Sequence, residues 1–215
     1  GIAGHRRLQQ RRGEHYLAEF KLEGECEGLM LSGRADGYDP ISGVLEEIKT
    51  HRGDLSRISA AQQSLHWAQL RVYGALLCKC ENLPGIELRL SYYDIACDQE
   101  TQLHEIAEAT FLQKCLQNFC QQFRGWHLQQ QLHKNQRNAA LVKLKFPFSR
   151  FRKGQRELAE SVFKSIRLER SLLLQAPTGI GKTVGTLFPS LMAMPAERLD
   201  CIFYLTARNT IRQLA

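Results

Sequence analysis

The chain has 215 residues, of which 43% are hydrophobic and 24% are charged, a balance typical of a folded protein with one large domain or two small ones. No apolar run approaches the roughly 20 residues that cross a bilayer, and the N-terminus lacks the apolar stretch of a signal peptide, so we expect a cytoplasmic protein with no membrane partner. Lysine and arginine outnumber aspartate and glutamate by 29 to 22. A polyanion such as DNA is therefore the first partner to consider, although a merely basic surface fits the charge equally well.

Apolar spacing in the first part of the chain predicts a basic helix, a hairpin of two strands, a long helix, a further strand and a second long helix. In this order, the expected ranges are residues 2–19, 28–38, 44–50, 55–80, 85–95 and 103–132. The run Asp39-Pro-Ile-Ser-Gly43 supplies the turn of the hairpin.

The character of the sequence changes at Phe146-Pro-Phe148, and we expect a domain boundary near residue 145. Beyond it, helices are expected over residues 152–167 and 181–194, and strands over 171–175 and 199–205. Strands that alternate with helices indicate an α/β architecture. The chain opens on Gly1 rather than on methionine and closes on Ala215, and we expect part of the machinery to lie outside it.

The seven cysteines predict neither a disulfide framework nor a zinc site. Their number is odd, and no C-x-x-C pair occurs among them. We expect most of them to be small buried apolar residues.

A phosphate-binding loop is the most specific motif in the chain. It reads Ala176-Pro-Thr-Gly-Ile-Gly-Lys-Thr183 and is expected between a strand and a helix. In such a loop, backbone amides and the helix N-terminus hold the phosphates of ATP, while the lysine meets the β and γ phosphates and the last hydroxyl ligates Mg²⁺. The candidate ATP-binding residues of the loop are Thr178, Gly179, Gly181, Lys182 and Thr183.

Three blocks define the surroundings of this loop, at residues 146–158, 175–183 and 203–208. Together they resemble the start of superfamily 2 helicases of the DinG and xeroderma pigmentosum group D type. The resemblance implies a nucleotide-base contact from Gln155, with Arg152, and a segment that tracks the DNA strand at residues 206–208. It also implies an acidic box beyond Ala215, so we expect that this chain alone is not a competent motor.

Asp36, Glu47 and Lys49 form a second candidate site. A carboxylate two residues before a lysine occurs twice, at Glu19-Phe-Lys21 and at Glu47-Ile-Lys49, but only the second pair lies on a strand of the expected hairpin. Strand alternation places Glu47 and Lys49 on one face, and the turn folds Asp36 back towards it. Two carboxylates can bind Mg²⁺ or Mn²⁺ and the lysine can orient water, which is the chemistry of phosphodiester hydrolysis. The alternative is a solvated hairpin whose charges have no function.

Gln69 and Tyr73 share one side of the expected long helix because they are four residues apart. The set Gly33-Arg-Ala-Asp36, Glu47-Ile-Lys49 and Gln69-x-x-x-Tyr73 resembles the RecB-like branch of the PD-(D/E)xK nucleases over about residues 1–130. The resemblance implies a restriction-endonuclease-like mixed sheet flanked by helices, with catalytic roles for Asp36, Glu47, Lys49, Gln69 and Tyr73. It also implies a histidine metal ligand, and His5 matches the local pattern Gly1-x-x-x-His5, although a surface histidine is the alternative.

We therefore expect an α/β protein with a nuclease domain over residues 1–145, whose metal site holds His5, Asp36 and Glu47. The start of a P-loop (RecA-like) parallel α/β domain is expected over residues 146–215. The expected activity is metal-dependent hydrolysis of DNA, which by the resemblance leaves a 5′ phosphate, coupled in the intact protein to an ATP-dependent DNA helicase. Two alternatives stay open: a non-catalytic DNA-binding module of a helicase, and a P-loop NTPase that acts on small molecules.

Overall fold

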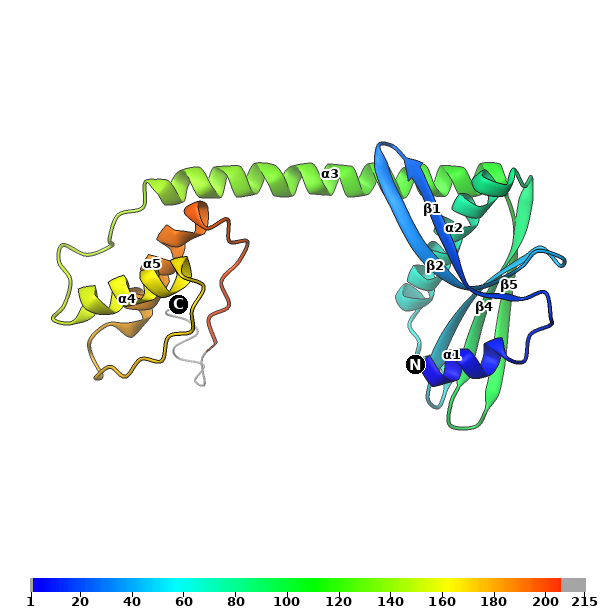
Figure 1. Cartoon of the computed structure of the whole chain (residues 1–215), viewed down its shortest axis with the longest axis horizontal. Helices are drawn as coiled ribbons and strands as arrows, with labels where there is room; N and C mark the ends of the chain where they lie inside the picture. The colour runs from blue at the N-terminus through cyan, green and yellow to red at the C-terminus, as the bar shows by residue number, and fades with distance from the viewer. Residues whose placement is uncertain (1, 206–215) are drawn as a thin grey trace. The chain divides into compact units, whose positions relative to one another are not determined.

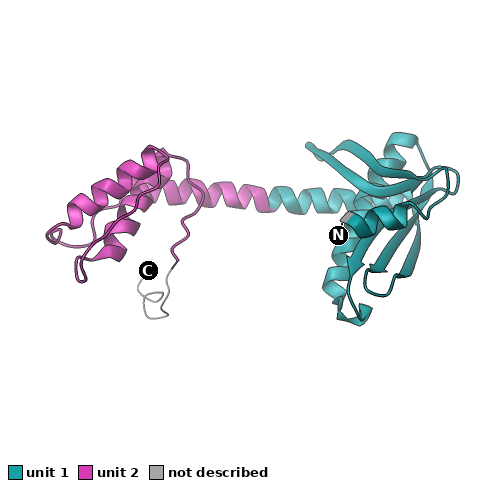
Figure 2. Ribbon diagram, turned by 60° about the horizontal axis from the view of Figure 1, so that its bottom comes forward, with its two compact units in different colours: residues 1–125 teal, residues 126–215 magenta. Residues whose placement is uncertain are grey.

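The computed structural model describes residues 2–205, and the chain divides into two compact units, residues 1–125 and 126–215 (Figure 2). The division falls inside helix α3 (Ala109–Val142). The boundary expected near residue 145 lies just after the end of this helix, and it stays a prediction.

Unit 1 is built on a sheet with helices packed beside it (Figure 1), and the five strands of this sheet follow in the order β1-β2-β3-β4-β5. Only β3 and β4 run parallel, and the other neighbours are antiparallel. The strands are β1 (Leu17–Cys26), β2 (Leu29–Asp39), β3 (Val44–His51), β4 (Gly85–Asp94) and β5 (Gln99–Glu108). The helices of this unit are α1 (Ile2–Gln9), η1 (Leu55–Arg57), α2 (Ala60–Glu81) and the first part of α3. Unit 1 is thus the mixed α/β domain that the sequence predicts.

Helix α2 forms the crossover between the parallel strands β3 and β4. It begins at a capping box, in which the Ser59 side chain accepts from the Gln62 amide and the Gln62 side chain accepts from the Ser59 amide, and it ends at Asn82 in the left-handed conformation. Its inner side joins one face of the sheet and the first turns of α3 in the main core. The fully buried members of this core include Leu45, Leu70, Leu77, Leu88, Leu90 and Leu112.

Helix α1 covers the other face of the sheet. Leu8 packs with Ile48 and Tyr93 in a second, small cluster. Gly4 allows the close approach, because a Cβ atom at this position would lie 2.8 Å from Cγ2 of Thr50. Gly4 and Leu8 lie one helical turn apart, and both contact the sheet. These contacts hold the intervening His5 beside the sheet.

Two strands of unit 1 form in places where the sequence predicted helix. The basic helix, expected to reach residue 19, ends at Gln9, and residues 17–26 form β1. The second long helix starts at Ala109, and residues 99–108 form β5. Both are edge strands of the sheet and carry many charged side chains, which are typical of edges and which dilute the apolar alternation that identifies a strand.

The described part of unit 2 contains the end of α3, α4 (Gln155–Arg167) and α5 (Lys182–Ala196). Residues 171–175 and 199–205 were expected to be strands, and neither forms one. A strand needs a neighbour that pairs with its backbone, and no such pairing occurs for these segments within residues 126–205. Most of their apolar side chains stay exposed, as for Leu173 and Leu205. The parallel sheet expected here is therefore not formed in the described residues.

No helix within residues 2–205 combines the length and the apolar character that a bilayer-spanning segment requires.

Candidate active site

Asp36 lies where β2 separates from β3. The two strands pair from Asp39 and Val44 as far as Gly37 and Glu46, and the pairing then stops. At this fork the Asp36 side chain takes over the role of a ladder partner, because its Oδ2 accepts a hydrogen bond of 2.6 Å from the Ile48 amide. The carboxylate is thereby fixed beside β3 by a backbone contact.

His5 reaches the same carboxylate from α1. Its Nδ1 lies 3.0 Å from Oδ1 of Asp36, and both side chains are largely covered, with exposed fractions of 27% and 13%. This contact fixes the orientation of the imidazole ring. The structure thus brings together His5 and Asp36, two of the three expected metal ligands of this site.

Glu47 and Lys49 begin a chain of polar contacts that runs from β3 to α2. The Lys49 Nζ donates to Oε1 of Glu47 at 2.6 Å and to Oε1 of Gln69 at 3.0 Å. The Gln69 amide in turn donates to the Tyr73 hydroxyl at 3.2 Å. The four side chains are therefore connected in the order Glu47, Lys49, Gln69 and Tyr73, on the side of β3 that faces α2.

Gly33 makes room for the last member of this chain. A Cβ atom at Gly33 would lie 2.5 Å from Cε1 of Tyr73, closer than side chains approach each other. The first residue of the Gly33-Arg-Ala-Asp36 block thus provides the space in which the Tyr73 ring lies against β2.

Burial changes the acidity of both carboxylates. Desolvation raises the pKa of Asp36, against the opposing effects of the Ile48 amide, His5 and Lys49. Desolvation together with the negative charge of Asp36 raises the pKa of Glu47 to about 7, although the contacts with Lys49 and Gln69 oppose the shift. The raised pKa values mean that burial, and for Glu47 also the charge of Asp36, disfavours the charged carboxylates more than the surrounding donors favour them.

The donor set fits a divalent cation. Oε2 of Glu47 is buried and has no hydrogen-bond partner, and carboxylate oxygens are the ligands that Mg²⁺ and Mn²⁺ prefer. Within residues 2–205, however, no three His, Cys, Asp or Glu side chains are already clustered as a metal site. The residues therefore offer suitable ligands without displaying an assembled coordination sphere.

Gln9 and Glu19 adjoin this site; Gln9 was not predicted as part of it, and for Glu19 a supporting place beside it was the less favoured expectation. The Gln9 side chain donates to the Asp36 carbonyl at 2.9 Å and to Oε1 of Glu19 at 3.3 Å. The available signal was the helical spacing of four between His5 and Gln9. Glu19 was expected at an exposed helix end, whereas it lies in β1 at a positive φ of 55°.

Glu46 is the centre of a buried network that the sequence did not predict. Its carboxylate accepts from Arg12 at 2.9 and 2.5 Å, from the Tyr16 hydroxyl at 2.7 Å and from the Ser91 hydroxyl at 2.5 Å. Arg12 also binds Glu100. These contacts tie the segment between α1 and β1 to the sheet and so hold α1 in place.

The phosphate-loop motif of unit 2 precedes α5, which begins at Lys182. Gly179 and Gly181 have positive φ angles of 87° and 84°, which glycine adopts without strain. The Lys182 Nζ donates to the carbonyl oxygens of Ala176 and Pro177 at 2.8 Å each. Thr178 is exposed and Thr183 is half-buried in the first turn of α5.

Gln155 and Arg152 both contact the loop. Gln155 is buried, its amide donates to the Gly181 carbonyl at 3.1 Å, and its Oε1 accepts from the Arg152 backbone amide at 3.0 Å. The Arg152 guanidinium donates to the Gly179 carbonyl at 2.5 Å. The structure thus brings Gln155 and Arg152 to the loop, and residues 206–208, expected to track a DNA strand, lie outside the described residues.

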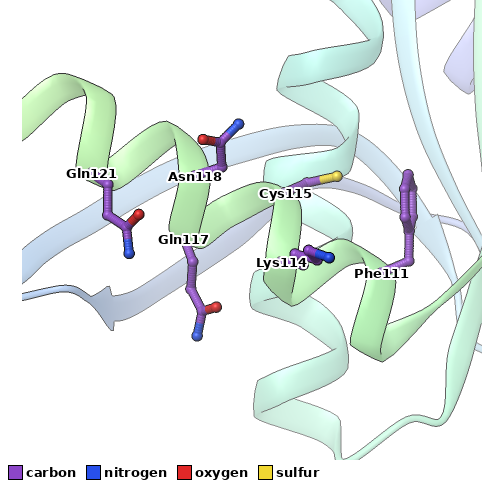
Figure 3. A pocket seen from close by; sticks show the side chains of 6 residues that line it. All are labelled: Phe111, Lys114, Cys115, Gln117, Asn118 and Gln121. Carbon is purple, nitrogen blue, oxygen red and sulfur yellow. The ribbon is translucent and has the colours of Figure 1, made fainter.

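A hollow of about 580 Å³ along α3 provides a contrast (Figure 3). All six lining side chains come from this one helix, and they include a single charge, Lys114, and no carboxylate. It offers no carboxylate or imidazole ligand, and it lacks the convergence of several elements seen around Asp36. The lining residues are Phe111, Lys114, Cys115, Gln117, Asn118 and Gln121.

Comparison with known proteins gives a limited result. No family model matches the chain. Over 65 residues the chain is 38% identical to a probable ATP-dependent helicase of Methanocaldococcus jannaschii, a match that covers 30% of this chain and 10% of that protein. The chain thus has sequence similarity to a helicase of which it matches about a tenth of the length.

Among solved structures, the chain resembles the crystal structure of SSO0001 with a TM-score of 0.36 and 21% identity, over 54% of this chain and 55% of that one.

Proposed function

We propose that residues 1–145 form a metal-dependent nuclease domain that hydrolyses DNA phosphodiester bonds. The observation that carries the proposal is the convergence of Asp36 and of the chain Glu47, Lys49, Gln69 and Tyr73 from three separate elements. A solvated hairpin would leave these charges exposed, whereas Glu47 has a side-chain exposure of 4% and carries an unpartnered oxygen. Burying two carboxylates with so little compensation costs stability, which suggests a functional reason.

Asp36, Glu47 and His5 would hold the Mg²⁺ or Mn²⁺ ion, which when bound neutralises phosphate charge and acidifies water. Lys49 holds its ammonium group beside Glu47, where it can orient the attacking water and offset the negative charge that develops on the phosphate. Gln69 and Tyr73 act as positioning residues, because they touch Lys49 or each other and hold the ammonium group in one geometry.

Calorimetric titration of the chain with Mn²⁺ tests the metal site directly. We expect one binding event that Asp36→Asn and Glu47→Gln each weaken by about tenfold or more, since each removes a charged ligand. Unchanged Mn²⁺ binding in both variants would remove the basis of the proposal. If the chain binds Mn²⁺ at this site but does not cleave DNA, the alternative of a non-catalytic DNA-binding module is favoured instead.

We further propose that residues 146–215 form the start of an ATP-binding helicase domain. The contacts of Gln155 with Gly181 and of Arg152 with Gly179 support this, since they connect the start of α4 and the segment before it to the phosphate loop. The similarity to a named ATP-dependent helicase supports it independently. A P-loop enzyme acting on small molecules has no need of a DNA-binding unit, so salt-dependent DNA binding by the chain would argue against that alternative.

A further inference from the structure

A cavity of about 340 Å³ lies beside the candidate active site and shares His5 with it. Its other lining residues are Arg6, Gln9, Glu19 and Arg34, which come from α1, β1 and β2. Two arginines, one amide and one carboxylate around a single hollow make a polar site that none of the roles proposed above uses.

The arginines near α1 differ in whether their charge is already compensated. Arg7 and Arg11 both pair with Asp98, at 3.8 and 2.6 Å. Arg12 is neutralised by Glu46 and Glu100. Arg6 is exposed, and within the described residues its side chain has no ion pair or hydrogen bond. The one uncompensated guanidinium of this group is thus the one that lines the cavity.

Arg34 has a partner that a stronger anion can replace. Its NH1 lies 3.6 Å from Oε2 of Glu19, and both side chains are more than half exposed, at 58% and 52%. An exposed pair at this distance is weak. A phosphate group offers three acceptor oxygens to the planar guanidinium and binds it more strongly.

Glu19 has an unusual backbone conformation, which helps to determine where its side chain lies. Its φ of 55° is rare for a residue with a side chain, and Gln9 holds its carboxylate by a hydrogen bond of 3.3 Å while also binding the Asp36 carbonyl at 2.9 Å. The carboxylate therefore occupies a defined position in the cavity, where it reduces the positive potential that the two arginines create.

We propose that this cavity binds a backbone phosphate of the DNA strand next to the phosphate that is cleaved. The proposal rests on the proposed nuclease function, since it is the shared residue His5 that relates the cavity to the reacting phosphate. Arg6 and Arg34 supply the charge, Gln9 supplies a neutral donor, and Glu19 limits the affinity so that a cleaved strand can leave. Occupancy of this site fixes the register of the strand relative to Asp36 and Glu47.

The test is binding of a fluorescein-labelled single-stranded DNA oligonucleotide to the whole chain in EDTA, followed by fluorescence anisotropy at several salt concentrations. We expect Arg6→Gln to weaken binding about tenfold and to reduce the slope of log K against log salt by about 0.7, the value for one phosphate contact on a single strand. Arg11→Gln is the matched control just after the same helix, because the Arg11 guanidinium donates a hydrogen bond of 2.6 Å to Asp98, and we expect a clearly smaller effect. Arg34→Gln provides a second variant should Arg6→Gln fold poorly.

Glu19→Gln gives an effect of the opposite sign. Removing its charge releases Arg34, so we expect binding to strengthen several-fold, by more than in Glu25→Gln, which makes the same charge change at another exposed position of β1. Wild-type affinity and salt slope in both arginine variants, or weaker binding by Glu19→Gln, would overturn the proposal. Because these measurements need no metal and no cleavage, they decide it separately from the nuclease assay: an inactive chain with the expected binding changes would refute the proposed chemistry and retain the phosphate site.

Discussion

Glu47 shows how one residue combines a structural cost with a chemical opportunity. Its carboxylate is buried beside Asp36, receives one contact from Lys49 and leaves one oxygen without a partner. Its pKa rises to about 7 because desolvation and the Asp36 charge outweigh the attraction of Lys49. A metal ion would relieve both the missing positive charge and the missing contact.

The shift predicts a pH-dependent stability in the metal-free protein. Between the ordinary pKa of 4.5 and the folded-state pKa of about 7, the folded chain binds more protons at Glu47 than the unfolded chain, so the free energy of unfolding falls as pH rises through this window. Glu47→Gln removes this dependence. We expect the variant to resemble the wild type in stability near pH 4.5 and to exceed it near pH 8 by at most about 3 kcal/mol.

Urea unfolding of both proteins in EDTA at the two pH values measures this difference. Glu25→Gln is the control, since Glu25 is exposed in β1. A stability difference between Glu47→Gln and the wild type that does not change with pH would contradict the cause assigned to the shift.

At the same scale, local sequence was sufficient to group Asp36, Glu47 and Lys49, because a hairpin and strand alternation bring them together. The spacing of Gln69 and Tyr73 placed them on one side of α2. The sequence could not predict that Asp36 replaces a ladder partner at the fork between β2 and β3, or that Glu46 gathers Arg12 and Glu100, since these contacts join residues far apart in the chain.

The helices and strands were predictable from the sequence where a buried face requires apolar residues at a regular spacing. The strands β2, β3 and β4 and the helix α2 have apolar residues repeated at the spacing of their structure, and all four were expected. The edge strands β1 and β5 were missed, because an edge strand packs on one side only and has charges that resemble those of a surface helix. In unit 2 the apolar runs 171–175 and 199–205 predict strands that do not form, because such a run specifies a strand only where a partner strand is present.

The contact between β2 and α2 provides a prediction at this scale. A methyl group at Gly33 would collide with the Tyr73 ring, so Gly33→Ala should displace Tyr73 and break its hydrogen bond with Gln69. We expect a loss of about 1–3 kcal/mol in the free energy of unfolding, measured by urea denaturation, together with a lower kcat for DNA cleavage. Gly13→Ala is the control, because a Cβ atom at Gly13 meets nothing within 4 Å. Equal stability of the two alanine variants would show that Tyr73 is not packed against Gly33.

For the whole molecule, the two candidate sites lie in different compact units. Asp36, Glu47 and Lys49 belong to residues 1–125, and the phosphate loop belongs to residues 126–215. All side chains proposed for hydrolysis therefore come from unit 1, and we expect DNA cleavage with Mg²⁺ or Mn²⁺ in the absence of ATP.

Lys182→Ala tests this separation. Lys182 is held by the carbonyls of Ala176 and Pro177 at the position where the loop would meet phosphate, so its loss should weaken binding of a fluorescent ATP analogue about tenfold or more. Cleavage of DNA should be unchanged. Lys164→Ala, an exposed lysine of α4, serves as the control for both measurements. Cleavage that requires ATP, or that falls in Lys182→Ala, would contradict the independence of the two activities.

The most direct test of the central claim is cleavage of labelled DNA in Mg²⁺ by the wild type, Lys49→Ala and Lys21→Ala. Lys49 and Lys21 each follow a glutamate by two residues, but Lys49 binds Glu47 and Gln69, whereas Lys21 is exposed and pairs with Glu23 at 3.5 Å. We predict that the wild type and Lys21→Ala cleave DNA, that EDTA stops both, and that Lys49→Ala is inactive although folded. Cleavage by Lys49→Ala at the wild-type rate would contradict the assignment of the active site.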